Sequence, residues 1–297
     1  MLQYLLIRLW IAGFRHLPFD SAVRLGAVLG GLIYRMDRRH RRITLDNLEK
    51  ALGGQMDAAQ RAHIAEASFR NLGRSLAEIA RLADTTPKEI AQRVTIEGFE
   101  NYQAARDRQK GVICLSAHLG NWEWLTAALS SKGAPLYLVA RALDDPRLDA
   151  LLNAQRTAHG NWVLNKRTAA GELTRLLRAG KTVGFLLDQN TRAQDAVFVD
   201  YFGMPAATHK GVAIVALRTG APVLPLFIYR EAGRHRLTIE KAIDLTRTGN
   251  LQRDVHNATA LFTRAIEAAV RRHPDQWLWV HRRWKTQPPP PPASRRD

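Results

Sequence analysis

Two residues at one junction of the chain have the types and the spacing needed for proton transfer. His118 follows a short apolar run, and Glu123 stands five positions later, after a Gly-Asn turn and near the start of a helical pattern. A histidine whose imidazole is oriented by a carboxylate is a general base. Such a base can take the proton of an alcohol, so that the alcohol oxygen attacks an acyl group. The alternative is a histidine that only caps or packs at the start of a helix.

The chain contains a second histidine with an acid five positions later, His235 and Glu240. With ten histidines, chance alone gives about one such pair in a chain of this composition. Residues 235 to 240 alternate polar and apolar side chains, which is typical of a half-exposed strand. Side chains five apart on a strand point to opposite faces, so we expect that this pair does not meet. His118 and Glu123 flank a turn, where the same spacing can bring two side chains together.

Other polar residues also follow apolar runs that have the character of strands. Arg141 and Asp188 each come directly after such a run. Because ligands of open α/β sheets bind at the carboxyl ends of the strands, we expect these residues and His118 to converge on one crevice. Arg156, late in the helical pattern that follows Arg141, can reach the same place. The alternative for each arginine is a solvated surface charge.

Several familiar catalytic motifs are missing from the sequence. It has no P-loop, no G-x-G-x-x-G, no Gly-x-Ser-x-Gly elbow and no cluster of histidines with metal-ligand spacing. We therefore expect no metal and no cofactor. The chemistry would depend on a histidine base that acts without a nucleophile from the protein.

From about residue 94 onward, short apolar runs alternate with amphipathic helical patterns. This alternation predicts an α/β fold, in which a mixed, largely parallel sheet is covered by helices, with residues 235 to 240 completing a hairpin. Residues 189 to 210 are predicted as a substrate lid or, alternatively, as a short hairpin packed on the sheet, with Tyr201 to Met204 at the tip. The expected strands lie at 111 to 115, 136 to 140, 162 to 164, 182 to 187 and 222 to 228, and the expected helices at 57 to 83, 121 to 132, 146 to 159, 169 to 179, 209 to 219 and 251 to 272.

The first 36 residues are expected to contact a membrane. Residues 1 to 14 are apolar apart from Gln3 and Arg8, but this run is shorter than the roughly 20 residues of a comfortable span. It lacks the basic start and the cleavage site of a signal peptide. We interpret residues 1 to 36 as two helices that lie in the inner leaflet of a membrane. A single tilted transmembrane anchor and a pair of helices packed on the domain core are the alternatives.

The charge balance predicts an anionic partner. The chain has 297 residues, with 44 Lys and Arg against 27 Asp and Glu, a formal net charge of +17. A dense basic cluster, Arg35 to Arg42, comes directly after apolar residues, a combination typical of proteins that bind anionic headgroups. No nucleic-acid-binding module is recognisable, so we expect no nucleic acid partner. The single cysteine, Cys114, lies in an apolar run and is expected to fill the core.

These motifs, in this order, resemble the bacterial lipid A late acyltransferases, the lauroyl and myristoyl branch related to the glycerolipid and lysophospholipid acyltransferases. The resemblance extends from the apolar start to Trp284 and is strongest in the HX4(D/E) pattern of His118 and Glu123. The other matching stretches are Tyr34 to Arg39 with Asn47 and Leu48, Arg141, Arg156, Leu187 to Gln189, Phe202 to Ala206 with Thr208 and Gly211, Thr219 to Pro225, and Pro274 to Trp284.

The resemblance implies a glycerolipid acyltransferase-like fold and O-acyl transfer from an acyl carrier protein thioester to a hydroxyl of a lipid A precursor. Such an enzyme works at the cytoplasmic face of the bacterial inner membrane, where anionic lipids are further partners. His118 would be the general base, with Glu123 holding its imidazole, and Arg141 would contact the phosphate or sugar of the acceptor. The candidate substrate-binding residues are Asn121, Arg141, Arg156 and Asp188.

Other activities and acceptors stay open. Proteins of the same kind act on other glycolipids, aminolipids or lysophospholipids. A lipid hydrolase in which His118 activates water, and a non-catalytic basic protein that binds membranes, are the remaining hypotheses. The expected organisation is a membrane-associated anchor at 1–36, an acyltransferase domain at 37–286 and a disordered proline-rich tail at 287–297.

Overall fold

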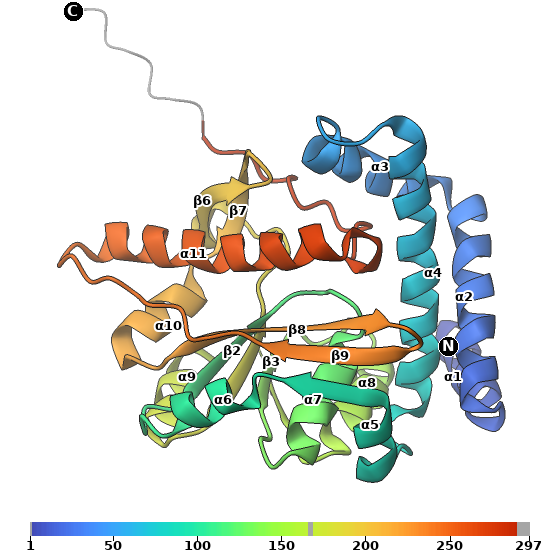
Figure 1. Cartoon of the computed structure of the whole chain (residues 1–297), viewed down its shortest axis with the longest axis horizontal. Helices are drawn as coiled ribbons and strands as arrows, with labels where there is room; N and C mark the ends of the chain where they lie inside the picture. Colours follow the sequence, from blue (N-terminus) through green and yellow to red (C-terminus); the bar gives the residue numbers. More distant parts are fainter. Residues whose placement is uncertain (1, 166–168, 290–297) are drawn as a thin grey trace, which may run out of the picture.

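A computed structural model describes residues 2–165 and 169–289, which form the α/β fold expected from the alternating pattern (Figure 1). The strands are β1 (Val94–Glu97), β2 (Val112–Ser116), β3 (Tyr137–Ala140), β4 (Trp162–Asn165), β5 (Thr182–Leu186), β6 (Ala196–Tyr201), β7 (Met204–His209), β8 (Val223–Glu231) and β9 (Arg234–Ile239). The main sheet has seven strands in the order β1-β9-β8-β2-β5-β3-β4. Only the β8–β9 hairpin is antiparallel within it, so the prediction of a mixed, largely parallel sheet is confirmed.

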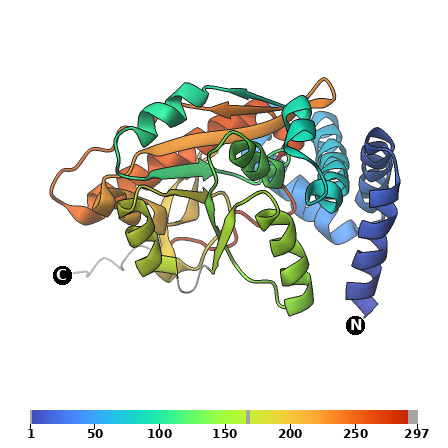
Figure 2. The ribbon, with the colours of Figure 1, turned by 90° about the horizontal axis from the view of Figure 1, so that it is seen from below.

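Helices cover both faces of the sheet and stand along one end of it (Figures 1 and 2). They are α1 (Leu2–His16), α2 (Phe19–Met36), α3 (Arg38–Leu52), α4 (Ala58–Leu82), α5 (Pro87–Arg93), α6 (Phe99–Arg106), α7 (Trp122–Ser131), α8 (Pro146–Thr157), α9 (Ala169–Arg178), α10 (Gly211–Thr219) and α11 (Leu251–Arg272). One core lies between the sheet and α9, α10 and α11, and a second lies between the sheet and α5, α6 and α7.

The central strand β2 contributes to both cores, because successive side chains of a strand point to opposite faces. Ile113 and Leu115 face α9 to α11, whereas Val112 and Cys114 face α5 to α7. This double burial explains why the strand appears in the sequence as a continuous apolar run. Cys114 is buried among the core residues of this face, as predicted. Its burial raises the pKa of the thiol to about 12.

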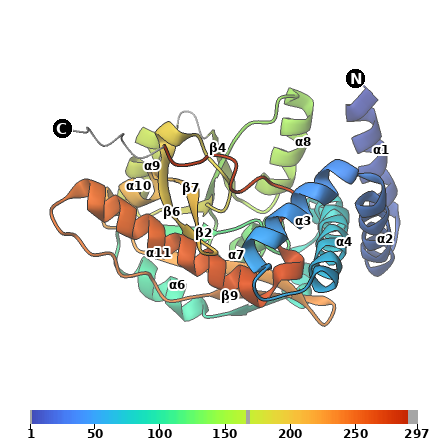
Figure 3. The ribbon, with the colours of Figure 1, turned by 90° about the horizontal axis from the view of Figure 1, so that it is seen from above.

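The N-terminal helices pack on α4 at one end of the molecule (Figure 3). The contact between α2 and α4 is so close that a Cβ on Gly26 would lie 2.4 Å from the carbonyl oxygen of Gly73. On the other side of α2, apolar side chains are exposed beside the exposed charges of Arg24 and Arg35, with Val28 at 53% and Met36 at 80% exposure. In the described part of the chain, no helix combines the length and the hydropathy required to cross a membrane.

The stretch predicted as a substrate lid is a hairpin of β6 and β7 that packs against α11. Tyr201 and Phe202 at its tip are 0% and 6% exposed, and their rings contact Trp277, Trp279 and Trp284. Burial of these large rings is too favourable for the tip to line an open channel. The lid hypothesis is therefore wrong for this tip. The alternative of a short hairpin is confirmed, but the hairpin packs on α11 and not, as expected, on the main sheet.

Some elements were not anticipated from the sequence, namely α3, β1, α5 and α6. The arginines of α3 obscure its amphipathic pattern in the sequence, although the helix buries Leu48 and Leu52. Asp37 directly precedes α3 and caps it, because its carboxylate accepts from the backbone N–H of His40 at 3.0 Å. Most of the predicted proline-rich tail, residues 290–297, lies outside the described residues. The division of the chain at residue 36 stays a prediction.

Candidate active site

His118 lies just beyond β2, and the carboxylate that holds its imidazole belongs to Asp188. The Nδ1 atom is 2.8 Å from Oδ1 of Asp188, and the backbone N–H of His118 donates to Oδ2 at 3.0 Å. Asp188 follows β5, which pairs in parallel with β2, so the two strand ends meet as expected. We predicted that Glu123 holds the imidazole, and for this hydrogen bond the prediction is wrong.

Asp188 is held as an anion in the interior. Its residue is 2% exposed, and Trp277 donates its indole N–H to Oδ2 at 2.8 Å. Burial alone would raise the pKa of Asp188, but the charge and hydrogen bonds of His118 and the indole of Trp277 outweigh burial and lower the pKa to about 2. An ionised carboxylate only accepts hydrogen bonds, so Nδ1 of His118 carries a proton, and when the imidazole is neutral its lone pair is on Nε2.

The free lone pair of His118 faces the exposed side chain of Gln189. The amide nitrogen of Gln189 lies 3.3 Å from Nε2 of His118, close enough to donate a weak hydrogen bond. Any group that hydrogen-bonds to this Nε2 atom would take the place of the Gln189 amide.

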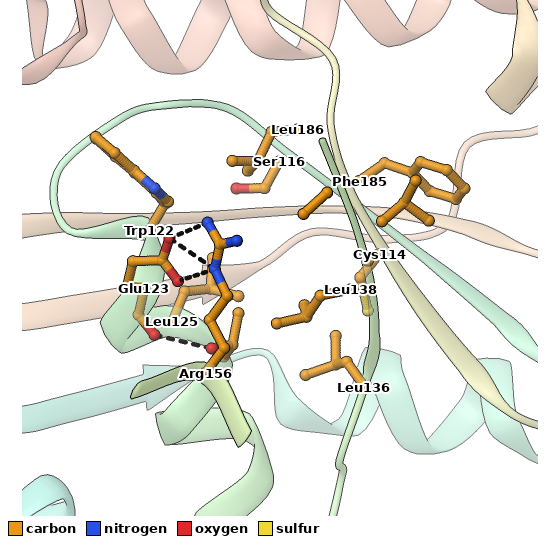
Figure 4. A pocket seen from close by; sticks show the side chains of 14 residues that line it. Cys114, Ser116, Trp122, Glu123, Leu125, Leu136, Leu138, Arg156, Phe185 and Leu186 are labelled. Atoms are coloured by element: carbon orange, nitrogen blue, oxygen red, sulfur yellow. Dashed lines mark hydrogen bonds and ion pairs between the residues drawn. The ribbon is translucent and has the colours of Figure 1, made fainter. Parts of the chain in front are cut away.

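Glu123, the second residue of α7, forms an ion pair with Arg156 from α8 instead of contacting His118 (Figure 4). The Nε atom of Arg156 donates to both carboxylate oxygens at 3.1 and 3.0 Å, and Nη2 donates to Oε1 at 2.6 Å. Burial alone would lower the pKa of Arg156, but Glu123 outweighs burial and raises it. Among the described residues Nη1 of Arg156 has no partner, and in Figure 4 it points away from Glu123.

An apolar pocket lies beside this ion pair, between α7 and the strands β3 and β5 (Figure 4). Figure 4 shows the Glu123–Arg156 pair facing Leu136, Leu138 and Cys114 across the pocket. Trp122 also lines the pocket, and its ring meets the imidazole of His118 edge to face with centroids 4.8 Å apart. His118 therefore lies next to a mainly apolar cavity, whose polar lining is the Glu123–Arg156 ion pair and the hydroxyl groups of Ser116 and Thr126.

The other two candidate residues lie elsewhere. Asn121 is 0% exposed, and its side chain is directed to Glu78 on α4, so it offers no surface to a substrate in this structure. The side chain of Arg141 is 73% exposed and reaches Asp144 at 3.4 Å, which fits the alternative of a solvated charge. A contact between Arg141 and the acceptor stays a prediction.

The second histidine-acid pair does not meet, as expected from strand geometry. His235 on β9 is buried against Glu78, with Nε2 3.0 Å from Oε1, whereas Glu240 pairs with Arg272 at 2.9 Å. In the described residues, no group of His, Cys, Asp and Glu is arranged to hold a metal ion. The sequence analysis assigned no role to Trp277, although this residue lies in one of the stretches that match the family. In the structure it donates to Asp188, 89 positions away.

Fold and site together define an α/β protein in which a histidine, oriented by a buried carboxylate, stands next to a mainly apolar pocket. The chain belongs to the bacterial lipid A biosynthesis acyltransferase family, whose sequence profile matches residues 1–286. The family expected from the motifs is confirmed, and the enzyme is an acyltransferase.

Several characterised relatives are similar over most of their length. The lipid A biosynthesis palmitoleoyltransferase of Escherichia coli (strain K12) is 25% identical over 283 residues, which cover 94% of this chain and 89% of that protein. The lauroyltransferase of the same organism is 26% identical over 275 residues, covering 92% and 88%. Its myristoyltransferase is 26% identical over 263 residues, covering 89% and 80%.

Proposed function

We propose that this enzyme transfers a fatty acyl chain from an acyl carrier protein thioester to a hydroxyl of a lipid A precursor. The observation that carries the proposal is the hydrogen-bonded pair of His118 and Asp188 beside an apolar pocket. Membership of the lipid A acyltransferase family supports the acyl group and the class of acceptor. The three relatives above are named for palmitoleoyl, lauroyl and myristoyl transfer in lipid A biosynthesis.

In the proposed reaction, Nε2 of His118 takes the proton of the acceptor hydroxyl while its oxygen attacks the thioester carbon. Asp188 stabilises the imidazolium that forms, because it accepts from Nδ1 in both protonation states. Collapse of the tetrahedral intermediate breaks the carbon–sulfur bond, and the imidazolium returns its proton to the leaving thiolate. The ester and the free thiol are the products, and no covalent bond between the acyl group and the enzyme forms at any step.

Arg156 supplies positive charge for the oxyanion that develops on the thioester oxygen. Glu123 binds Nε and Nη2 of the guanidinium and so fixes its orientation, which leaves Nη1 to donate. The role proposed for Glu123 is therefore to orient Arg156. The alternative expected from the sequence, that Glu123 acts directly on His118, requires a rearrangement of both carboxylates.

The apolar pocket is the proposed site of the acyl chain. Most of its lining consists of aliphatic and aromatic side chains from α7, β3 and β5, and these gain by contact with an alkyl chain. Ser116 at the end of β2 and Thr126 on α7 add two hydroxyl groups to the lining. Glu123 and Arg156 are paired at its wall, so the reactive carbonyl can meet Nη1 of Arg156 at this end while the chain extends along the leucines. Pocket depth would then set the length of the chain that is transferred.

A groove between α3 and the C-terminal segment supports an anionic partner. It is lined by Arg38, Arg39, Arg42, Lys50, Arg282 and Lys285, with Asp46 as the acidic side chain. Within the described residues, none of these six cations forms a salt bridge. Acyl carrier protein, the acceptor phosphate and anionic lipids at the cytoplasmic face of the inner membrane are the proposed partners of this charge.

The test uses the purified enzyme with a radiolabelled acyl carrier protein thioester, with and without a lipid A precursor. We expect label to move to the acceptor, and we expect folded His118→Ala to lose this transfer while His256→Ala, an exposed histidine of α11, keeps it. Release of free fatty acid at the same rate without acceptor would indicate a hydrolase. Transfer by folded His118→Ala at the wild-type rate would exclude His118 as the base.

The acceptor is identified by a second experiment. Other glycolipids, aminolipids and lysophospholipids are offered in parallel, and the lipid A of cells that lack the gene is analysed by mass spectrometry. We expect a lipid A species that lacks one acyl chain. If lipid A is unchanged and the enzyme acylates another lipid, that lipid is the acceptor. If no lipid is acylated, the non-catalytic alternative is favoured.

A further inference from the structure

Glu78 on α4 is a fully buried carboxylate that the proposed mechanism does not use. Arg230 donates Nη1 and Nη2 to its two oxygens, both at 2.8 Å, and Nε2 of His235 lies 3.0 Å from Oε1. Burial alone would raise the pKa of Glu78, but His235 and Arg230 outweigh burial and hold the pKa far below its usual range. A charge in the interior is tolerated only when it is paired in this way, so its location calls for an explanation.

The third partner of Glu78 belongs to the catalytic motif. The side-chain amide nitrogen of Asn121 donates to Oε2 of Glu78 at 2.8 Å, and Asn121 is itself 0% exposed. Because a carboxylate can only accept, the nitrogen of the Asn121 amide must face Glu78 and its oxygen must face the other way. That oxygen accepts from the backbone N–H of Trp124 at 3.4 Å and caps the start of α7.

The same helix holds the backbone of this turn. Ser75, one turn before Glu78 on α4, donates its hydroxyl to the carbonyl of Gly120 at 3.1 Å. On the opposite side, the N–H of Gly120 donates to the carbonyl of Gln276 at 3.0 Å. Gly120 has φ +59°, and a Cβ there would lie 2.1 Å from the carbonyl oxygen of Ile228. The turn between His118 and α7 therefore has no room to shift while these contacts last.

We infer that Glu78 is a positioning residue for the active site. It fixes the orientation of the Asn121 amide, which sets the first turn of α7 and so places Glu123 and the turn that carries His118. The effect on turnover rests on the proposed function. The effect on the order of the turn does not, and it can be measured in the absence of any substrate.

The test compares Asn121→Ser and Glu78→Gln with Asn101→Ser as the matched control. Serine keeps an N-cap for α7 but cannot reach Glu78, and Asn101 is a half-buried asparagine on α6 that donates to the carbonyl of Ile239 at 2.8 Å. We expect Asn121→Ser and Glu78→Gln to lower kcat about ten- to a hundredfold, because small displacements of reacting groups cost this much, and to leave KM within about twofold. Backbone amides of residues 117–126 should exchange hydrogen faster in both variants and at the wild-type rate in the control.

Two outcomes would overturn the inference. One is a folded Asn121→Ser variant with wild-type kcat and wild-type exchange at residues 117–126. The other is a raised KM with unchanged kcat and unchanged exchange, which would make Asn121 a substrate-binding residue instead. If Glu78→Gln fails to fold, Asn121→Ser decides, because it leaves the pairing of Glu78 with Arg230 intact. A wild-type enzyme without transferase activity would refute the proposed function, while the exchange measurement would still test the positioning role.

Discussion

The two carboxylates near His118 differ in what they hold. Asp188 accepts from the imidazole, from the His118 backbone and from Trp277, whereas Glu123 binds only the guanidinium of Arg156 among the described residues. A carboxylate that accepts at Nδ1 fixes the tautomer with a basic Nε2. A carboxylate that binds an arginine fixes the direction of a positive charge. Loss of either should reduce turnover, but for different reasons.

Replacement of Asp188 by asparagine should invert the tautomer of His118. Two N–H donors, from the backbone of His118 and from Trp277, converge on Oδ2, so in Asp188→Asn the amide oxygen would have to stay at this position and the amide nitrogen would face Nδ1. Nδ1 must then accept, Nε2 carries the proton, and the base is lost. We expect kcat to fall by about a hundred- to ten-thousandfold with the fold retained. Trp277→Phe, which removes one donor and keeps the carboxylate, should lose much less, and equal losses in the two variants would contradict this account.

The lowered pKa of Asp188 also predicts how stability depends on pH. Its pKa of about 2 in the folded enzyme lies below the ordinary value of 3.8, so protonation is harder in the folded than in the unfolded state. The resulting stabilisation, on the order of 2 kcal/mol, is fully present above about pH 4 and is lost as the pH falls toward 2. The free energy of unfolding, measured in urea, should therefore fall more steeply between about pH 4 and pH 2 in the wild type than in Asp188→Asn. Parallel curves over this range would contradict the prediction.

At the scale of elements, α7, β3 and β5 supply most of the lining of the pocket proposed for the acyl chain, so a larger side chain on β3 should limit how far an alkyl chain can enter. Leu138→Trp adds bulk to the pocket lining and should displace about two methylenes of a sixteen-carbon thioester but none of a twelve-carbon one. We expect kcat/KM for the longer chain to fall about tenfold relative to the shorter one, since each methylene denied burial costs about 0.8 kcal/mol. Leu143→Trp, at a residue that is 43% exposed and outside the pocket, is the control. An unchanged ratio in a folded Leu138→Trp enzyme would place the chain elsewhere.

Sequence patterns predicted the elements better than the contacts between them. Strands such as β2 and helices such as α11 were evident because their apolar residues recur with the period of one element. The helix α3 was not, because the arginines at its start mask the buried Leu48 and Leu52. The spacing of His118 and Glu123 indicated a site but not its pairing. The partner of the imidazole stands 70 positions away, just after a neighbouring parallel strand, and no short-range pattern selects it over a nearer carboxylate.

For the whole molecule, the apolar face of the N-terminal helices and the basic groove of α3 follow one another along the chain. The exposed apolar side chains of α2 continue to its last residue, Met36, and the arginines of the groove begin two residues later at Arg38. Apolar side chains next to cations are the combination that binds an anionic bilayer surface. The two parts should respond differently to salt, because only the charged part is screened.

Two pairs of substitutions separate these contributions. Val28→Glu with Ile33→Glu, both on the exposed face of α2, should weaken flotation with lipid vesicles at low and high salt alike. Arg39→Glu with Arg42→Glu, in the α3 groove, should weaken binding only to vesicles that contain anionic lipid, by about 1 kcal/mol or more for each lost cation, and should reduce the dependence on salt. Arg253→Glu with Arg264→Glu makes the same change of net charge on the exposed side of α11 and serves as the control. If this control weakens binding as much as the α3 pair, attraction depends on the net charge of +17 and not on the groove.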